Sequence, residues 1–120
     1  MKPGEEVTFY VTMSGDPAYA LDTHITYDPE YVAIRNVQNG DMFDRVILNE
    51  IKTNTIVFSA AYDPGKTTFK QEGIAFTFTA KALKKTQETL LLFDLKNTIA
   101  AQDGTNILKN AEPATIHIFD

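Results

Sequence analysis

Residues 19–31 read YALDTHITYDPEY, and the alternation in this stretch indicates how the chain folds. A strand places successive side chains on opposite faces, so every second residue shares a face. One face is predicted to pack on a core, and it comprises Tyr19, Leu21, Thr23, Ile25 and Tyr27. The other face is small and polar, and it comprises Ala18, Ala20, Asp22, His24 and Thr26. Asp28-Pro29 ends the strand, because proline fixes φ and has no amide N–H for a ladder. The polar face is open either to solvent or to a partner.

The rest of the chain repeats such patterns at short intervals. The predicted strands cover residues 6–13, 19–27, 31–37, 45–52, 55–61, 73–83, 89–95 and 114–119. Turn signals separate them, and residues 97–110 are predicted to be irregular, with a turn at Asp103-Gly104. No stretch has a convincing helical period. The pattern predicts an all-β sandwich of about eight strands.

The predicted hairpin of residues 45–52 and 55–61 carries an unusual outer face. In its second arm the inward residues are Ile56, Phe58 and Ala60, and the outward residues are Val57, Ser59 and Ala61. Solvated strand faces more often carry Lys, Glu and Thr, so a flat face of small residues is compatible with contact to another protein. Cover by a loop of the domain itself is the alternative that this pattern leaves open.

Length and charge exclude several classes of protein. A chain of 120 residues, 43% of them hydrophobic, predicts one domain over residues 1–120. The chain has a net charge of −5, whereas nucleic-acid binders carry an excess of basic residues. We therefore expect no nucleic-acid partner. No apolar run approaches the roughly 20 residues that span a bilayer, so we expect no membrane insertion. The absence of cysteine removes disulfides, thiolate metal sites and cysteine nucleophiles.

Residues that could support catalysis are few. His24 and His117 lie in predicted strands, with no second ligand at metal-binding spacing. Acidic neighbours such as Asp28 and Glu30 arise by chance among 16 acidic residues. The sequence has no nucleophile elbow, phosphate-binding loop or EF-hand, and the stretch from Asp94 to Asn106 matches a calcium loop poorly. We therefore expect no enzyme activity and no cofactor in this domain.

A carbohydrate-binding module of β-sandwich fold is the main alternative to a protein-binding role. Such modules lay flat aromatic side chains against sugar rings, and tryptophan is the favoured platform. The chain has no tryptophan, and its exposed aromatic candidates are Tyr10, Tyr31 and Tyr62. A structural repeat of a surface protein, without a ligand of its own, is the third alternative.

Short motifs follow one another along most of the chain, and their order and spacing are informative together. They are Lys2-Pro3-Gly4-Glu5-Glu6-Val7, Tyr27-Asp28-Pro29, residues 37–40, Ile56-Val57-Phe58, residues 73–78 and Thr89-Leu90. This series resembles the cohesin domain, the dockerin-binding module of cellulosomal and related scaffold proteins. The resemblance implies a jelly-roll β-sandwich of about eight or nine strands, without catalysis. It also implies a dockerin partner that carries any calcium, and an extracellular or cell-surface location within a larger secreted protein.

The resemblance further implies which residues face the dockerin. The predicted contact residues are Ala20, Asp22, His24, Glu50, Val57, Ser59, Ala61, Tyr62 and Gly65. The Asp22 carboxylate would accept hydrogen bonds from the dockerin, whereas Ala20 stands where many cohesins have an asparagine. Glu50 falls roughly where the family often has an aromatic contact. The face is therefore cohesin-like in position and divergent in chemistry, and the resemblance does not identify the dockerin or the cohesin type.

The chain departs from the cohesin pattern at its start. Cohesins have a strand before the Lys-Pro-Gly turn, and this sequence begins at that turn. The usual neighbour of that strand is the C-terminal strand, here residues 114–119, whose edge would then have unpaired backbone groups. We predict that a neighbouring molecule, through self-association, or a rearranged terminus covers this edge. Otherwise the fragment should be less stable than one with the strand restored.

Overall fold

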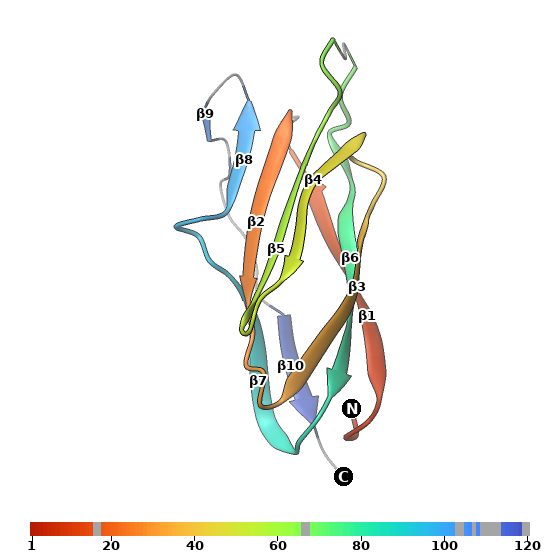
Figure 1. The fold of residues 1–120 in the computed structure, drawn as a ribbon, viewed down its shortest axis with the longest axis vertical. Helices are drawn as coiled ribbons and strands as arrows, with labels where there is room; N and C mark the ends of the chain where they lie inside the picture. Colours follow the sequence, from red (N-terminus) through yellow and green to blue (C-terminus); the bar gives the residue numbers. More distant parts are fainter. Residues whose placement is uncertain (16–17, 66–67, 103–104, 107, 109–113, 119–120) are drawn as a thin grey trace.

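Two antiparallel β-sheets form the protein in a computed structural model that describes residues 1–15, 18–65, 68–102, 105–106, 108 and 114–118 (Figure 1). The strands are β1 (Glu6–Ser14), β2 (Ala20–Thr26), β3 (Val32–Asn39), β4 (Arg45–Ile51), β5 (Thr55–Ala61), β6 (Glu72–Ala82), β7 (Thr86–Phe93), β8 (Ile99–Gln102), β9 (Thr105–Asn106) and β10 (Ala114–Ile118). The smaller sheet has the order β1-β6-β3, and the larger has the order β10-β7-β2-β5-β4. The prediction of an all-β sandwich is confirmed.

Strand β2 is the centre of the larger sheet. One of its edges pairs with β5 along its whole length. Its other edge is shared, because β8 pairs with residues 20–22 and β7 pairs with Ile25 and Thr26. The turn between β7 and β8 therefore lies beside the middle of β2, as Figure 1 shows. Every element that meets β2 is distant from it in sequence.

The core lies between the two sheets and is rich in phenylalanine. Phe58 of β5 and Phe76 of β6 are fully buried, and their rings stack with centroids 4.4 Å apart. The predicted inward residues of β5 are all buried, namely Ile56, Phe58 and Ala60. The predicted core face of β2 is also buried except for half-buried Tyr19, which precedes the strand and stacks on Phe69. The alternation in the sequence thus identified the inner faces of both strands.

The prediction that residues 97–110 are irregular is wrong for residues 99–102 and 105–106, whereas Asn97, Thr98 and Leu108 lie outside strands as predicted. Residues 99–102 form β8 and residues 105–106 form β9, which pairs with it. Strand β8 forms because the edge of β2 offers it partners, with Ala100 opposite Leu21. The segment has no alternation of its own, so tertiary pairing decides its conformation. The predicted turn at Asp103-Gly104 lies outside the described residues.

Gly40, after β3, lies against the backbone of β6. Its N–H donates to Ala75 O at 2.9 Å, and a Cβ added at Gly40 would lie 2.0 Å from Ile74 O. Position 40 thus needs glycine because of this close backbone approach.

The N-terminus of the chain contacts β10. The Met1 ammonium group donates to His117 O at 3.0 Å, which is a contact of the kind predicted for a rearranged terminus. Among the described residues, β10 pairs with one strand, β7. The effect of an added first strand on stability stays a prediction, and Phe119, the predicted end of this strand, lies outside the described residues.

Candidate functional site

The outward surface of β8, β2, β5 and β4 forms one continuous face, here called the front face. Strand register assembles it in rows, in which Asp22 lies opposite Ser59 and Ile99, and Ser59 also lies opposite Leu48. The neighbouring rows contain His24, Val57 and Glu50 on one side, and Ala20 with Ala61 on the other. The front face is defined as Ala20, Asp22, His24, Leu48, Glu50, Val57, Ser59, Ala61 and Ile99. Seven of the nine predicted contact residues belong to it.

Asp22 is the polar centre of the front face. Ser59 Oγ donates to Asp22 Oδ1 at 2.7 Å, and His24 Nε2 lies 3.3 Å from the same oxygen. The Asp22 side chain is 47% exposed, so its carboxylate is held in position yet still reaches solvent. Among the described residues, no donor approaches Asp22 Oδ2. The arrangement can accept a hydrogen bond from an approaching partner without first losing an internal one.

A buried threonine and a turn hold His24 and β8 in place. His24 N donates to Thr98 Oγ1 at 3.1 Å, and Thr98 Oγ1 lies 3.2 Å from His24 O, which it can reach as a donor. The turn begins at Asp94, whose carboxylate accepts bonds from Asn97 Nδ2 and Lys96 N. The hydrogen bond from the Asn97 side chain is the main cause that holds the pKa of the Asp94 carboxyl below its usual range. Hydrogen bonds from backbone N–H groups and the nearby His24 lower this pKa further. Asp94 therefore supports the front face indirectly, through the turn that leads into β8.

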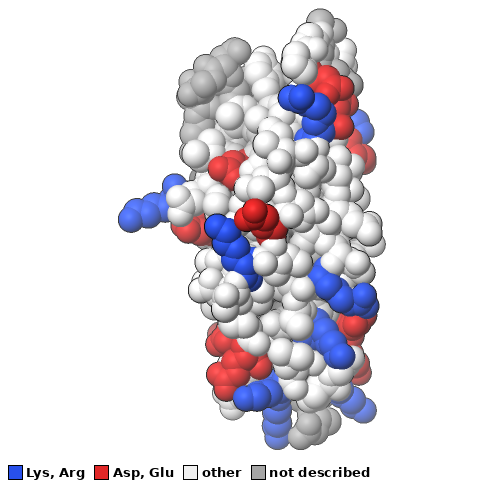
Figure 2. Space-filling model, viewed as in Figure 1, with Lys and Arg blue, Asp and Glu red and all other residues white. Residues whose placement is uncertain are grey.

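Apolar side chains border this polar centre. Leu48 and Ile99 flank the central row and are both 38% exposed, a notable exposure for such residues. Figure 2 shows a largely uncharged surface over β2, β5 and β4, with a few acidic and basic side chains near its middle and further charged side chains toward both ends of the molecule. Small and apolar groups around the Asp22 carboxylate, with Glu50 in the neighbouring row as the second acidic residue of the face, suit a protein interface in which charge is sparse.

The sequence missed Leu48 and Ile99 as members of the front face. A register irregularity between Val46 and Leu48 interrupts the alternation of β4, and Ile99 lies in the segment predicted to be irregular. Leu48 lies two residues before Glu50, so strand alternation places both on the same face, and this pattern could have predicted Leu48 as a member of the front face. No local pattern indicates Ile99, because its place depends on pairing with β2.

Three predicted contact residues are either buried or lie outside the rows of the front face. Val57 points outward but is 3% exposed, since it lies in register between the longer side chains of His24 and Glu50. Tyr62 was predicted to be exposed, and this is wrong, because the core holds it. Its ring lies 4.8 Å from that of Phe69, and its hydroxyl accepts a bond from Lys70 N. Gly65 lies beyond it in an exposed loop with φ of +85°, away from the rows of the front face.

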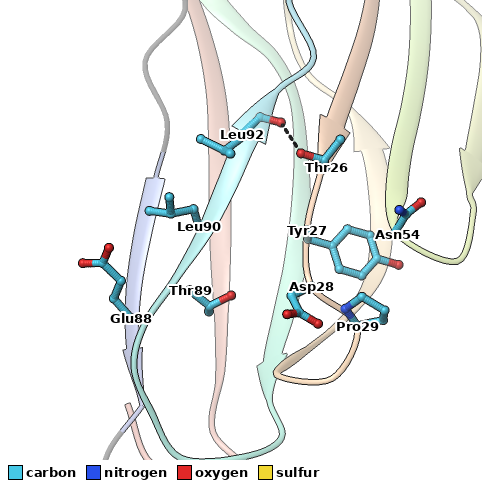
Figure 3. A pocket seen from close by; sticks show the side chains of 9 residues that line it. All are labelled: Thr26, Tyr27, Asp28, Pro29, Asn54, Glu88, Thr89, Leu90 and Leu92. Carbon is cyan, nitrogen blue, oxygen red and sulfur yellow. Dashed lines mark hydrogen bonds between the residues drawn. The ribbon is translucent and has the colours of Figure 1, made fainter.

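A shallow cleft of about 520 Å³ lies where β7 diverges from the end of β2 (Figure 3). Its lining residues are Thr26, Tyr27, Asp28, Pro29, Asn54, Glu88, Thr89, Leu90 and Leu92. Tyr27 is buried, which raises the pKa of its hydroxyl, and that hydroxyl donates to Lys52 O. The ring is therefore not a flat exposed platform for a sugar. Tyr10, the most exposed aromatic candidate, lies on β1 in the other sheet.

The described part of the chain shows no candidate metal centre and no membrane-spanning helix. Over these residues, no group of three or more His, Asp or Glu side chains is placed to hold a metal ion. No helix that is long and apolar enough to cross a membrane occurs in the same part of the chain. The front face is thus the surface with the clearest chemical character.

Fold and front face together define a β-sandwich protein-interaction module, and comparison with known proteins gives the family. The family model for the cohesin domain matches residues 1–118. The chain belongs to the cohesin family. No curated protein sequence matches it significantly.

Several solved cohesins have a similar fold. The third cohesin of ScaC from Acetivibrio cellulolyticus, solved in complex with the ScaB dockerin, has a TM-score of 0.83 at 16% identity, over 99% of this chain and 92% of that one. CaCohA2 from Clostridium acetobutylicum has a TM-score of 0.81 at 20% identity, over 98% and 84% of the two chains. A non-cellulosomal cohesin from the archaeon Archaeoglobus fulgidus has a TM-score of 0.79 at 14% identity, over 99% and 84%. The resemblance seen in the sequence is confirmed at the level of family and fold.

Proposed function

We propose that this cohesin domain is a non-catalytic adaptor that binds a dockerin through its front face. Membership of the cohesin family supports the partner class, and the ScaC cohesin of similar fold is solved in complex with a dockerin. The observation that carries the proposal is the front face itself, which is continuous, mostly uncharged and centred on a half-exposed carboxylate.

The chemistry of the front face suits close contact with a helix of the partner. Ala20 and Ala61 lie opposite each other and leave room for a backbone to approach. Leu48 and Ile99 supply apolar area on either side of the central row. Asp22 accepts a hydrogen bond from a hydroxyl or amide group of the partner, and Ser59 keeps the carboxylate oriented for it. A central polar anchor within an apolar surround is typical of energetic hot spots.

The proposal also covers calcium and the location of the domain. Any calcium in the complex belongs to the dockerin and not to this domain. The domain would recruit dockerin-bearing proteins to an extracellular scaffold or cell surface, as a part of a larger secreted protein. None of the family and fold matches reported above supports the carbohydrate-binding alternative.

Calorimetric titration tests the proposal directly. The domain is titrated with a panel of calcium-loaded dockerins that includes the ScaB dockerin, and each titration is repeated with chelator. We expect one-to-one binding to at least one dockerin, and loss of that binding with chelator. No binding across the panel, combined with retention of the domain on insoluble polysaccharide, would replace the proposal with the carbohydrate-binding alternative.

A further inference from the structure

The shallow cleft beside β7 contains a length of strand edge that no other strand of the described chain covers. Strand β7 lies inside the order of the larger sheet, with β10 on one side and β2 on the other. Its pairing with β2 covers only Leu92 and Phe93, whereas its pairing with β10 runs from Thr86 to Leu91. Residues 86–91 of β7 therefore have a strand partner on one side alone.

The residues that follow β2 cause this divergence. Asp28-Pro29 comes directly after the strand and its last core residue, and proline has no amide N–H with which to continue a ladder. Tyr27 is held on the β5 side, because its N–H donates to Asn54 O and its hydroxyl donates to Lys52 O, both at 3.0 Å. The end of β2 thus forms one wall of the cleft and β7 forms the other, as Figure 3 shows.

The alternation of hydrogen bonds indicates which backbone groups face the cleft. In an antiparallel ladder every second residue directs both its N–H and its C=O to the same neighbour. Asp94 N donates to His24 O at 2.7 Å, and two residues earlier Leu92 lies opposite Thr26, so these residues direct their backbone groups toward β2. Leu90 is the next residue in this series. Its N–H and C=O therefore point into the cleft, where no strand of the described chain pairs with them.

The side chains around this open edge are apolar in the middle, with one acidic residue on each wall. Leu90 and Leu92 are 36% and 39% exposed. Asp28 and Glu88 are exposed carboxylates, and neither forms an ion pair with a Lys or Arg in the described part of the chain. No basic residue lines the cleft among the residues that the structure describes. An occupant with cationic groups on apolar stems would complement both features.

We propose that this cleft binds an extended segment of a partner protein that carries alternate lysine residues, by strand addition to β7. In strand addition the main-chain bonds give affinity and alternate side chains give specificity. The segment exchanges one pair of backbone hydrogen bonds with Leu90. Its lysine stems cover Leu90 and Leu92, and its ammonium groups reach the carboxylates of Asp28 and Glu88.

This site is separate from the front face. None of the lining residues of the cleft belongs to the front face, although both lie on the larger sheet. The inference therefore does not depend on the proposed function, and a domain that binds no dockerin could still bind such a segment.

Titration of the isotope-labelled domain with a capped pentapeptide, Thr-Lys-Val-Lys-Thr, tests the site through its backbone amide NMR shifts. We expect saturable shifts centred on Leu90 and the other cleft residues, with a dissociation constant on the order of 1 mM. Absence of saturable shifts at these residues up to about 10 mM peptide would overturn the inference.

Two altered peptides separate backbone pairing from simple charge attraction. Glutamate in place of both lysines should raise the dissociation constant at least about tenfold, because it brings like charges to Asp28 and Glu88. Methyl groups on the backbone nitrogens of both lysines keep the charge and remove the donors, and they should weaken binding at least about tenfold as well. Equal binding of the glutamate peptide would refute the preference for lysine, and equal binding of the methylated peptide would refute strand addition.

Conservative variants of the domain test the two carboxylates. Glu88→Gln and Asp28→Asn should each raise the dissociation constant of the lysine peptide about two- to fivefold. Asparagine keeps the Oδ1 atom that accepts Glu30 N at 3.0 Å, so the turn after β2 is preserved. Glu72→Gln is the matched control, because it removes the same charge from an exposed residue of β6 outside the cleft. Peptide binding by both cleft variants that equals that of Glu72→Gln would refute the assigned role of the carboxylates.

Discussion

Replacement of Asp22 by alanine is the sharpest test of the front face. The change removes the carboxylate that lies at the centre of the face and accepts the Ser59 hydroxyl bond at 2.7 Å. The Asp22 side chain is 47% exposed, so the change leaves no buried cavity. The effects of Asp22→Ala on binding and on folding should therefore separate.

The expected loss of affinity follows from the bonds that Asp22 can make. A hydrogen bond to a charged group contributes about 1.5–3 kcal/mol, which corresponds to an increase of about 10- to 150-fold in the dissociation constant. The cost to folding is smaller, because only a half-exposed bond is lost, worth about 0.5–1 kcal/mol. A separate Ser59→Arg change should also weaken dockerin binding, since it puts a bulky cation on a flat surface beside the Asp22 carboxylate.

Calorimetry with the dockerin that binds in the panel measures the affinity, and thermal unfolding measures stability. Glu88→Ala is the matched control, because it also removes one negative charge but lies in the cleft beside β7. This control should change the dissociation constant less than about twofold in physiological salt, where charges beyond about 8 Å are screened. Dockerin binding that is unchanged by both Asp22→Ala and Ser59→Arg would show that the front face is not the binding surface.

Further predictions concern stability. Gly40→Ala should destabilise the fold by about 1–3 kcal/mol in urea unfolding, because its Cβ would overlap Ile74 O; an unchanged midpoint would contradict this. Phe58→Ala should lower the free energy of unfolding by about 3–5 kcal/mol in the same assay, since it removes the ring that stacks on Phe76 and leaves a cavity. A loss below about 1 kcal/mol would contradict that packing. The lowered pKa of Asp94 stabilises the fold above the ordinary value of 3.8, and this contribution is lost as pH falls through the lowered pKa. The difference in melting temperature between the natural chain and Asp94→Asn should therefore shrink from pH 5 to pH 2.5, and a constant difference would refute the role of this turn.

Alternation along the chain was enough to predict the longer strands and the inner faces of β2 and β5. Side-chain period is a local property, so Leu21, Ile25 and Phe58 could be assigned to the core without knowledge of the partners of their strands. The same period extends from Ile56 through Phe58 and Ala60 to Tyr62, and it indicates that Tyr62 is buried. The prediction of an exposed tyrosine failed because it treated the residue after Ala61 as a loop.

The sequence by itself determined the fold class, the inner faces of the strands and the outward direction of Asp22 and Ser59. Only the tertiary structure decided that these two residues lie directly opposite each other, that Leu48 and Ile99 border them, and that β8 exists at all. The physical reason is that strand register and strand order arise from pairing between segments far apart in the chain, and a local pattern of side chains carries no information about the partner.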